Sequence, residues 1–159
     1  MNSQRMRRWL VESAMAIRAQ RVEAREENLF VALLSEMVDR FDDIADYMTS
    51  ISCTTGHRPL NRKERNMLFL AFKSLVKPRR ASWRKIKDIE RVEDEPHCLA
   101  IITDYLSRIA SEIVSICERI HRFLNSYLIP SEDSAEARVF YRQMKADYFR
   151  YLAEIKTDE

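Results

Sequence analysis

The spacing of apolar residues along the chain predicts five amphipathic helices. Aliphatic and aromatic residues recur three and four positions apart, as they do on one face of an α-helix. The predicted helices are a first that starts at Glu26, a short second around 44–51, a third over 61–91, a fourth over 96–128, and a fifth that follows Ser134. The run S-C-T-T-G-H-R-P at 52–59 lacks this repeat and is expected to be a loop. Five helices with short connections indicate an all-α, antiparallel helical bundle.

Local sequence signals mark where three of these helices begin. Asn61 and Glu64 have the spacing of a capping box, in which each side chain bonds the backbone amide of the other residue. Pro96 follows three acidic residues, and proline and acids both suit the first turn of a helix. Ser134 is expected to cap the last helix through its hydroxyl.

Composition supports the helical fold and limits the function. The 159 residues include one glycine and four prolines, too few for the repeated tight turns of a β-sheet protein. The formal net charge is +2 although 33% of the residues are charged, which argues against a general polyanion binder. Three unpatterned cysteines indicate reduced thiols in an intracellular protein, and neither a metal site nor a cofactor is expected. No run approaches the ~18 apolar residues of a membrane span, so a soluble chain is expected.

The first 25 residues differ from the rest of the chain. They contain six arginines against two glutamates. We therefore divide the chain into a basic N-terminal extension, 1–25, and a helical domain, 26–159. An organelle-targeting peptide, a surface-seeking helix and a solvated extension all have such a composition, and the three interpretations stay open.

The stretch K-S-L-V-K-P-R-R-A-S-W-R at 73–84 combines positive charge with helical spacing. On a helix, Lys73, Arg80 and Arg84 fall within roughly 40° of one another, with Lys77 beside them. Such a stripe either is a solvated basic face or receives an anion with more than one negative charge, such as a phosphate monoester. Pro78 interrupts the stripe, because a proline inside a helix costs ~3 kcal/mol or introduces a kink. A kink there would turn Lys73 out of register with Arg80.

Ser82 is expected on the opposite side of this helix, since it lies about 180° from Lys73 on the helical wheel. The string R-R-A-S at 79–82 has the arginine spacing that basophilic kinases favour. Two interpretations of Ser82 stay open: a regulatory phosphorylation site, or a serine that bonds to its own helix.

Seven strings of the sequence occur, in the same order, in one known family. They are A-R-E-E-N at 24–28, E-R-N-M-L at 64–68, R-R-A-S-W-R at 79–84, A-I-I-T-D-Y at 100–105, L-I-P-S at 128–131, V-F-Y at 139–141 and D-Y-F-R-Y-L-A-E at 147–154. From Arg25 to Lys156 the chain resembles the 14-3-3 proteins, in particular those of plants. The resemblance implies an adaptor of signal transduction, not an enzyme, that binds phosphoserine or phosphothreonine in client proteins. It also implies a cytoplasmic location, with the nucleus as a further one.

The resemblance implies which residues bind the ligand. The phosphate pocket of the family takes a lysine and two arginines from the third helix and an Arg-Tyr pair from the fifth. These residues fall here on Lys73, Arg80, Arg84, Arg150 and Tyr151. The cationic stripe and the implied pocket are thus the same residues, and Arg150 adds a donor from a second helix.

The sequence departs from the family pattern in three ways. Lys77 and Pro78 stand where the family usually has Gly-Ala, and Gln143 replaces a lysine that touches the ligand. The resemblance also ends before the family's helices six to nine, which carry the apolar wall and the asparagines that hold the peptide backbone. The sequence therefore resembles the dimerising half of the family together with the phosphate pocket.

The resemblance further implies a dimer with a second copy or with another 14-3-3-like chain. The residues implied at the interface are Leu34, Val38, Arg40, Asp43, Tyr105, Arg108 and Glu112. Arg40 is expected to pair with Glu112 of the partner, and Asp43 with Arg108. The apolar members should supply most of the association while the charges set its orientation. The alternative interpretation is that these charged residues form an ordinary solvated surface. In the family, the serine that matches Ser82 also lies at the dimer interface.

Two other functions stay open. Without the second half of the groove, the chain could be a dimerisation partner or decoy. From a different class, the stretch 77–87 and the arginine-rich start could bind nucleic acid, with Trp9 and Trp83 as stacking residues. Steep salt dependence of polynucleotide binding would favour that function. Catalysis has no support, because the sequence has no glycine-rich phosphate loop and no histidine with a plausible nucleophile.

Overall fold

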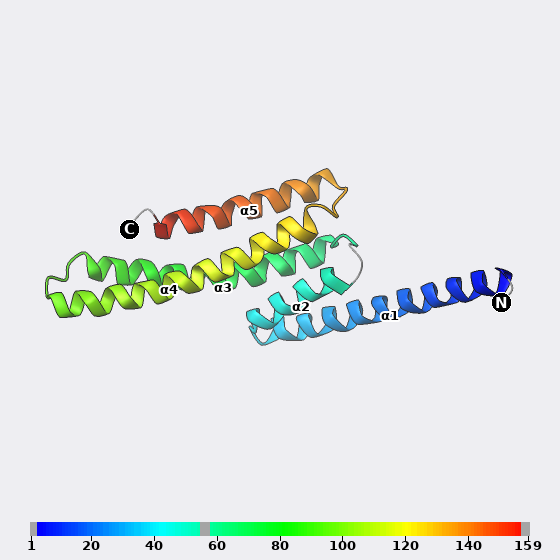
Figure 1. Ribbon diagram of the computed structural model, residues 1–159. Helices are drawn as coiled ribbons and strands as arrows, with labels where there is room; N and C mark the ends of the chain where they lie inside the picture. Colours follow the sequence, from blue (N-terminus) through cyan, green and yellow to red (C-terminus); the bar gives the residue numbers. More distant parts are fainter. Residues whose placement is uncertain (1–2, 55–57, 157–159) are drawn as a thin grey trace.

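The computed structural model describes residues 3–54 and 58–156, and the regular elements in these residues are helices (Figure 1). In chain order they are α1 (Ser3–Met37), α2 (Phe41–Thr54), α3 (Arg62–Glu90), α4 (Pro96–Phe123), the π-helical turn η1 (Leu124–Leu128) and α5 (Ala135–Lys156). The prediction of an all-α bundle is confirmed. None of the described helices is both long and apolar enough to cross a membrane.

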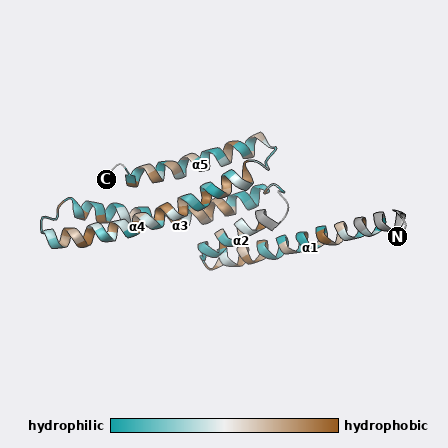
Figure 2. Ribbon diagram, in the orientation of Figure 1, coloured by the Kyte–Doolittle hydropathy of each residue, from teal (hydrophilic) through white to brown (hydrophobic). Residues whose placement is uncertain are grey.

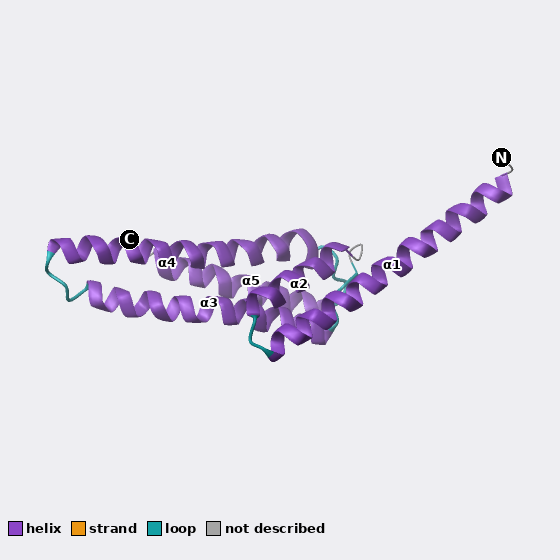
Figure 3. Cartoon of the chain, turned by 90° about the horizontal axis from the view of Figure 1, so that it is seen from below, coloured by secondary structure: helices purple, strands orange, loops and turns teal. Residues whose placement is uncertain are grey.

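The helices pack in the order of the chain. α1 packs on α2, α2 on α3, α3 on α4, and α4 on α5. Figures 1 and 3 show α3 and α4 as a long antiparallel pair, with α1 and α2 on one side and α5 on the other. The α3–α4 connection extends past α1 and α2, and the first half of α1 projects away from the bundle. The described part of the molecule is therefore elongated, with a helical arm at one end and an overhanging helix pair at the other.

Apolar side chains from all five α-helices form one buried cluster, and each helix carries both polar and apolar positions (Figure 2). Fully buried members include Ala32, Ile44, Met48, Phe72, Ile113 and Tyr141. Leu70, which the apolar repeat assigns to the buried side of α3, is instead 37% exposed. It lies about 100° around the helix from the buried Ala71, and therefore at the edge of the packed face.

α1 begins much earlier than predicted. It starts at Ser3 and not at Glu26, and it continues without a break through Arg25, so the boundary proposed for the basic extension lies inside a helix. Residues 12–24 are mostly alanine, arginine, glutamate, glutamine and methionine, which favour helix without needing a buried face. An apolar repeat therefore does not mark this segment as helical in the sequence. α2 likewise continues to Thr54, whereas a loop was predicted from residue 52, and residues 55–57 of that loop lie outside the described part.

The three helix starts that were predicted from local capping signals are confirmed. Asn61 Oδ1 accepts a hydrogen bond from the Glu64 amide at 3.0 Å, and the Glu64 carboxylate accepts one from the Asn61 amide at 2.8 Å. Pro96 is the first residue of α4. Ser134 Oγ accepts from the Ala137 amide at 3.4 Å.

The turn between α1 and α2 fixes the angle at which these helices pack. Asp39 has a φ of 56°, a left-handed conformation that aspartate tolerates better than most residues. The Arg40 amide bonds back to the Ser35 carbonyl at 2.9 Å, which closes α1 in a Schellman pattern. Arg40 then pairs with Asp43 in the first turn of α2.

Candidate functional site

α3 carries three of the predicted binding residues on one face. Lys73, Arg80 and Arg84 lie on a helix that continues through Pro78 and ends at Glu90. Pro78 is exposed, so its ring does not have to fit into the packed core. Its cost to the helix is the lost amide donor and the local backbone clash. Both arginines follow the proline, and both reach α5.

Glu154 of α5 brings these two arginines together. Arg80 Nε donates to Glu154 Oε2 at 2.6 Å, and Arg84 pairs with the other carboxylate oxygen, Oε1. The side chains of Arg80 and Glu154 are 14% and 22% exposed, and that of Arg84 is 55% exposed. Two guanidinium groups thus converge on one carboxylate at the edge of the bundle.

Tyr151 connects a third arginine to this group. The guanidinium carbon of Arg80 lies 3.8 Å from the centroid of the Tyr151 ring, and that of Arg150 lies 5.0 Å from it. Both distances are within the range of cation–π attraction. Arg150 also donates to Asp147 Oδ1 at 3.0 Å. The structure therefore groups four of the five predicted binding residues around one tyrosine ring and one carboxylate.

Lys73, the fifth predicted residue, lies two helical turns before Arg80. Its ammonium is 5.2 Å from the centroid of the Phe69 ring, and the residue is exposed. Among the described residues, it has no direct contact with the two arginines of α3 or with Glu154. Lys73 thus shares the face of the site but not its contacts.

Glu154 is the residue of the site that the sequence did not predict. Burial raises the pKa of its carboxyl, but hydrogen bonds from Arg80 and Arg84 outweigh this and hold the pKa below its ordinary value. The group is therefore ionised at neutral pH. The sequence spacing is the signal that could have identified Glu154. It follows Arg150 by four residues and Tyr151 by three, and so lies on the same helix face as these two predicted residues.

The site keeps an excess of positive charge. Arg80, Arg84 and Arg150 carry three charges against two on Glu154 and Asp147, and Lys73 adds a further cation on the same face of α3. The arrangement can accept an additional anion, or exchange its carboxylates for one.

The residues predicted at a dimer interface are exposed except for the half-buried Asp43, and their charged members are paired within the chain. Leu34, Val38 and Tyr105 are 46%, 63% and 47% exposed. The charged members form three pairs inside the chain, namely Arg40 with Asp43, Arg79 with Glu112 at 2.7 Å, and Arg108 with Asp104 at 2.6 Å. The predicted pairs between subunits stay predictions, since they require these intrachain pairs to be exchanged or shared.

Two neighbours on α3 bear on the other hypotheses. Ser82 is exposed, which leaves its hydroxyl accessible in a single chain. Trp83 is 6% exposed and belongs to the core, so it cannot stack on a nucleic-acid base, and this part of the nucleic-acid hypothesis is wrong. Trp9 is 62% exposed.

Within the described residues, no three His, Cys, Asp or Glu side chains gather as a metal site would require.

Comparison with known proteins assigns the chain to a family. A sequence model of the "14-3-3 protein" family matches residues 31–159, which include all five predicted pocket residues. The chain belongs to the 14-3-3 family. It is 44% identical over 137 residues to a 14-3-3-like protein of Pisum sativum, which covers 84% of this chain and 52% of the relative. It is also 44% identical over 138 residues to 14-3-3 protein 2 of Solanum lycopersicum, covering 84% of this chain and 54% of the relative.

A third plant relative gives the same result. The 14-3-3-like protein GF14 psi of Arabidopsis thaliana is 44% identical over 136 residues, which cover 83% of this chain and 53% of the relative. The chain thus spans about half the length of the curated relatives that it matches. The fold and family predicted from the sequence are confirmed.

Proposed function

We propose that this chain is an adaptor, not an enzyme, that binds phosphoserine- or phosphothreonine-containing segments of other proteins. The observation that carries the proposal is the convergence of Arg80 and Arg84 on the two oxygens of Glu154. Guanidinium groups that hold a carboxylate in this way present the same forked donors to phosphate oxygens. The carboxylate therefore stands where a phosphate group of a client protein would bind.

A phosphate has two advantages over the carboxylate that it would replace. It carries roughly −1.5 to −2 charges at pH 7 and three acceptor oxygens, whereas Glu154 offers one charge and two oxygens. Arg150, which is exposed and pairs only locally with Asp147, can donate to the additional oxygen. Lys73 can approach from the same face of α3 without breaking an ion pair. The expected partners are phosphorylated client proteins of the cytoplasm or the nucleus, where protein kinases act.

Calorimetry with one peptide in phosphorylated and unphosphorylated form tests this function. We expect the phosphorylated form to bind at least about tenfold more tightly, because charge-assisted hydrogen bonds contribute ~1.5 to 3 kcal/mol each. Arg84→Gln should remove most of that difference. Arg91→Gln, which removes an exposed arginine near the far end of α3, is the matched control and should leave it unchanged. Equal affinity for the two peptides would exclude the proposal.

We also propose that two chains associate through the apolar residues at the end of α1 and on α4. The proposal is supported by the exposure of Leu34 and Val38 on α1 and of Tyr105 on α4, because these two apolar surfaces of one chain are both accessible to a second copy. The overhang of the α3–α4 pair past α1 and α2 gives a surface against which a second copy can lie (Figure 1). Charge pairs from Arg40 to Glu112 and from Asp43 to Arg108 would then fix its orientation.

Light scattering at tens of micromolar distinguishes dimer from monomer. We expect a dimer that Arg40→Glu disrupts, because the reversed charge would face Glu112 of the partner. Arg62→Glu makes the same charge change at an exposed position at the start of α3 and should leave the dimer intact. A monomeric unmodified chain at that concentration would contradict the proposal.

A further inference from the structure

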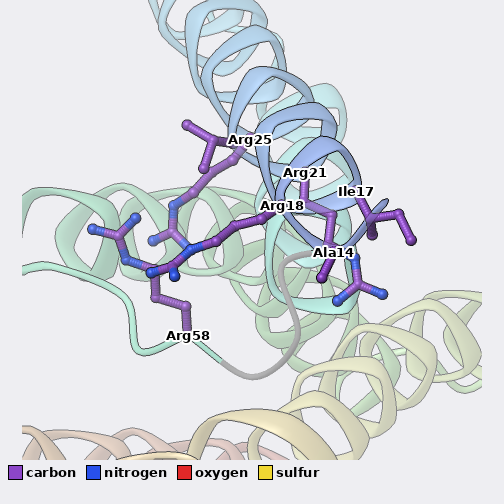
Figure 4. A pocket seen from close by; sticks show the side chains of 7 residues that line it. Ala14, Ile17, Arg18, Arg21, Arg25 and Arg58 are labelled. Carbon is purple, nitrogen blue, oxygen red and sulfur yellow. The ribbon is translucent and has the colours of Figure 1, made fainter. Parts of the chain in front are cut away.

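A groove lined by arginines lies between α1 and the segment that leads into α3. Its lining residues are Ala14, Ile17, Arg18, Arg21, Val22, Arg25 and Arg58. Figure 4 shows Arg18 and Arg25 of α1 extending toward Arg58 on the connecting segment. We call this the arginine groove. It is separate from the candidate phosphate site, because α1 and α5 lie on opposite sides of the α3–α4 pair (Figures 1 and 3).

Three of the four arginines have no acidic partner within the part of the chain that the structure describes. Among the described residues, Arg18, Arg21 and Arg58 form no ion pair, whereas Arg8 on the same helix pairs with Glu12 at 2.9 Å. Guanidinium groups that gather without an acid repel one another. The chain therefore maintains a concentration of positive charge here that its own carboxylates do not neutralise.

The groove is held in shape by a buried ion pair. Arg25 Nε donates to Glu64 Oε1 at 3.1 Å, and Arg25 Nη2 pairs with Oε2 of the same carboxylate. Arg25 Nη2 also reaches the Pro59 carbonyl at 3.4 Å. Arg25 and Glu64 are 7% and 2% exposed. The ion pair holds Arg25 in place, and the contact of Arg25 with the Pro59 carbonyl ties the residue that follows Arg58 to α1, so the backbone on the two sides of the groove is positioned without a ligand.

We propose that the arginine groove binds an acidic segment of a partner polypeptide. Charge complementarity requires a ligand with several negative charges, because Arg18 and Arg58 face each other across the groove and Arg21 lies farther along it (Figure 4). Ile17 and Val22, which are 51% and 41% exposed, offer apolar contacts between these charges. From Ala14 to Arg25 the helix is about 16 Å long, the length of about five extended residues. A peptide in which acidic and small apolar residues alternate fits this lining.

The lining favours a peptide over the other polyanions. None of the described residues that line the arginine groove is aromatic, so they offer no platform on which bases of a single-stranded nucleic acid could stack. The apolar residues lie inside a hollow between two segments of the chain, whereas a helix that binds a bilayer presents its apolar side as an open face. The acidic residues Glu12 and Glu23 lie on the far side of α1 by helical spacing, where they would not repel an acidic peptide. Glu26 and Glu64 line the adjoining hollow beside Arg58, and the charge of Glu64 is neutralised by Arg25.

Fluorescence anisotropy with a labelled peptide of alternating glutamate and alanine residues tests the proposal on the full chain. We expect the double variant Arg18→Gln with Arg58→Gln to weaken binding by about tenfold or more. The matched control is Arg138→Gln with Arg142→Gln, which removes two exposed arginines of α5 and the same total charge. It should leave binding unchanged. Circular dichroism of each variant verifies that the helices are retained.

Other outcomes would overturn the proposal. Equal weakening by both double variants would show that the peptide responds only to net charge. Tighter binding to vesicles of phosphatidylserine than to the peptide, lost on changing Arg18 and Arg58, would assign the groove to a membrane surface. The same result with a single-stranded polynucleotide would assign it to nucleic acid. Absence of binding at low ionic strength would exclude an anion site of any kind.

Discussion

Glu154 holds Arg80 and Arg84 together at the proposed phosphate site, and its carboxylate occupies both guanidinium groups. The carboxylate bonds one arginine with each oxygen and remains ionised, because these hydrogen bonds lower its pKa in spite of burial. A phosphate that enters the site must displace Glu154 or share the two guanidinium groups with it. One residue thus preorganises the site and competes with its ligand.

Glu154→Gln should therefore strengthen phosphopeptide binding. Glutamine keeps the size of the side chain and one acceptor oxygen but removes the competing charge, so less is lost when the ligand enters. We expect the affinity for the phosphorylated peptide to rise roughly tenfold, which corresponds to ~1.4 kcal/mol. Calorimetry measures the change, and Glu136→Gln, at the exposed start of α5, is the charge-matched control. Weaker binding by Glu154→Gln would show that positioning of the arginines outweighs competition.

Between elements, the contact that ties α1 to α3 is the buried pair of Arg25 and Glu64. Glu64 has two roles, since its Oε2 accepts both the Arg25 guanidinium and the Asn61 amide of the capping box. The same residue thus starts α3 and anchors the middle of α1. Loss of the charge on Glu64 would leave Arg25 buried without a counterion, which is the costly way to break an ion pair.

Glu64→Gln should lower the free energy of unfolding by roughly 3 kcal/mol or more. Glutamine can still accept a hydrogen bond from the Asn61 amide, so the helix cap is retained. The decrease in the free energy of unfolding then measures the loss of the ion pair. Arg8→Met breaks the exposed pair with Glu12 and should cost less than about 1 kcal/mol. Urea denaturation followed by circular dichroism measures both. In the double variant with Arg25→Met, much of the loss should return because no buried charge is left unpaired. If the decreases in the free energy of unfolding of the two single variants add up in the double variant, the unpaired buried charge is not the cause of the destabilisation.

The same elements show what the sequence could and could not predict. The start of α3 was predictable because the Asn61–Glu64 box is a local signal, and so was the shared face of Lys73, Arg80 and Arg84. The first half of α1 was not, because its helix rests on backbone propensity without an apolar repeat. Glu154 was not predicted either, since it is 74 residues from Arg80 and meets it only through tertiary packing.

At the scale of the whole molecule, the chain exposes apolar residues at two places. The overhanging end of α3 and α4 exposes Ile89, Val92, Ile101 and Tyr105, and the turn of α1 into α2, which is set back from that overhang (Figure 1), exposes Leu34, Met37 and Val38. A twofold dimer can pair two such surfaces reciprocally, each surface of one copy with the other surface of its partner. Ser82 lies on α3, on the opposite side of the helix from Lys73, and it is exposed in the single chain, as a contact with a second copy would require.

Ser82→Asp should weaken this dimer. A phosphate on Ser82 adds roughly −1.5 to −2 charges, and aspartate imitates part of that charge at a surface that would have to lose water on association. We expect the dimer dissociation constant, measured by analytical ultracentrifugation, to rise about tenfold or more, or ~1.4 kcal/mol. Ser13→Asp, on the projecting half of α1, makes the same change away from the apolar surfaces and is the control. If the Ser82→Asp chain dissociates at the same concentration as the unmodified chain, Ser82 has no part in controlling assembly. If the dissociation constant rises for Ser82→Asp but not for Ser13→Asp, and the helicity is unchanged, the charge at Ser82 controls association. The R-R-A-S string on α3 would then regulate the oligomeric state without a change in the residues of the proposed phosphate site.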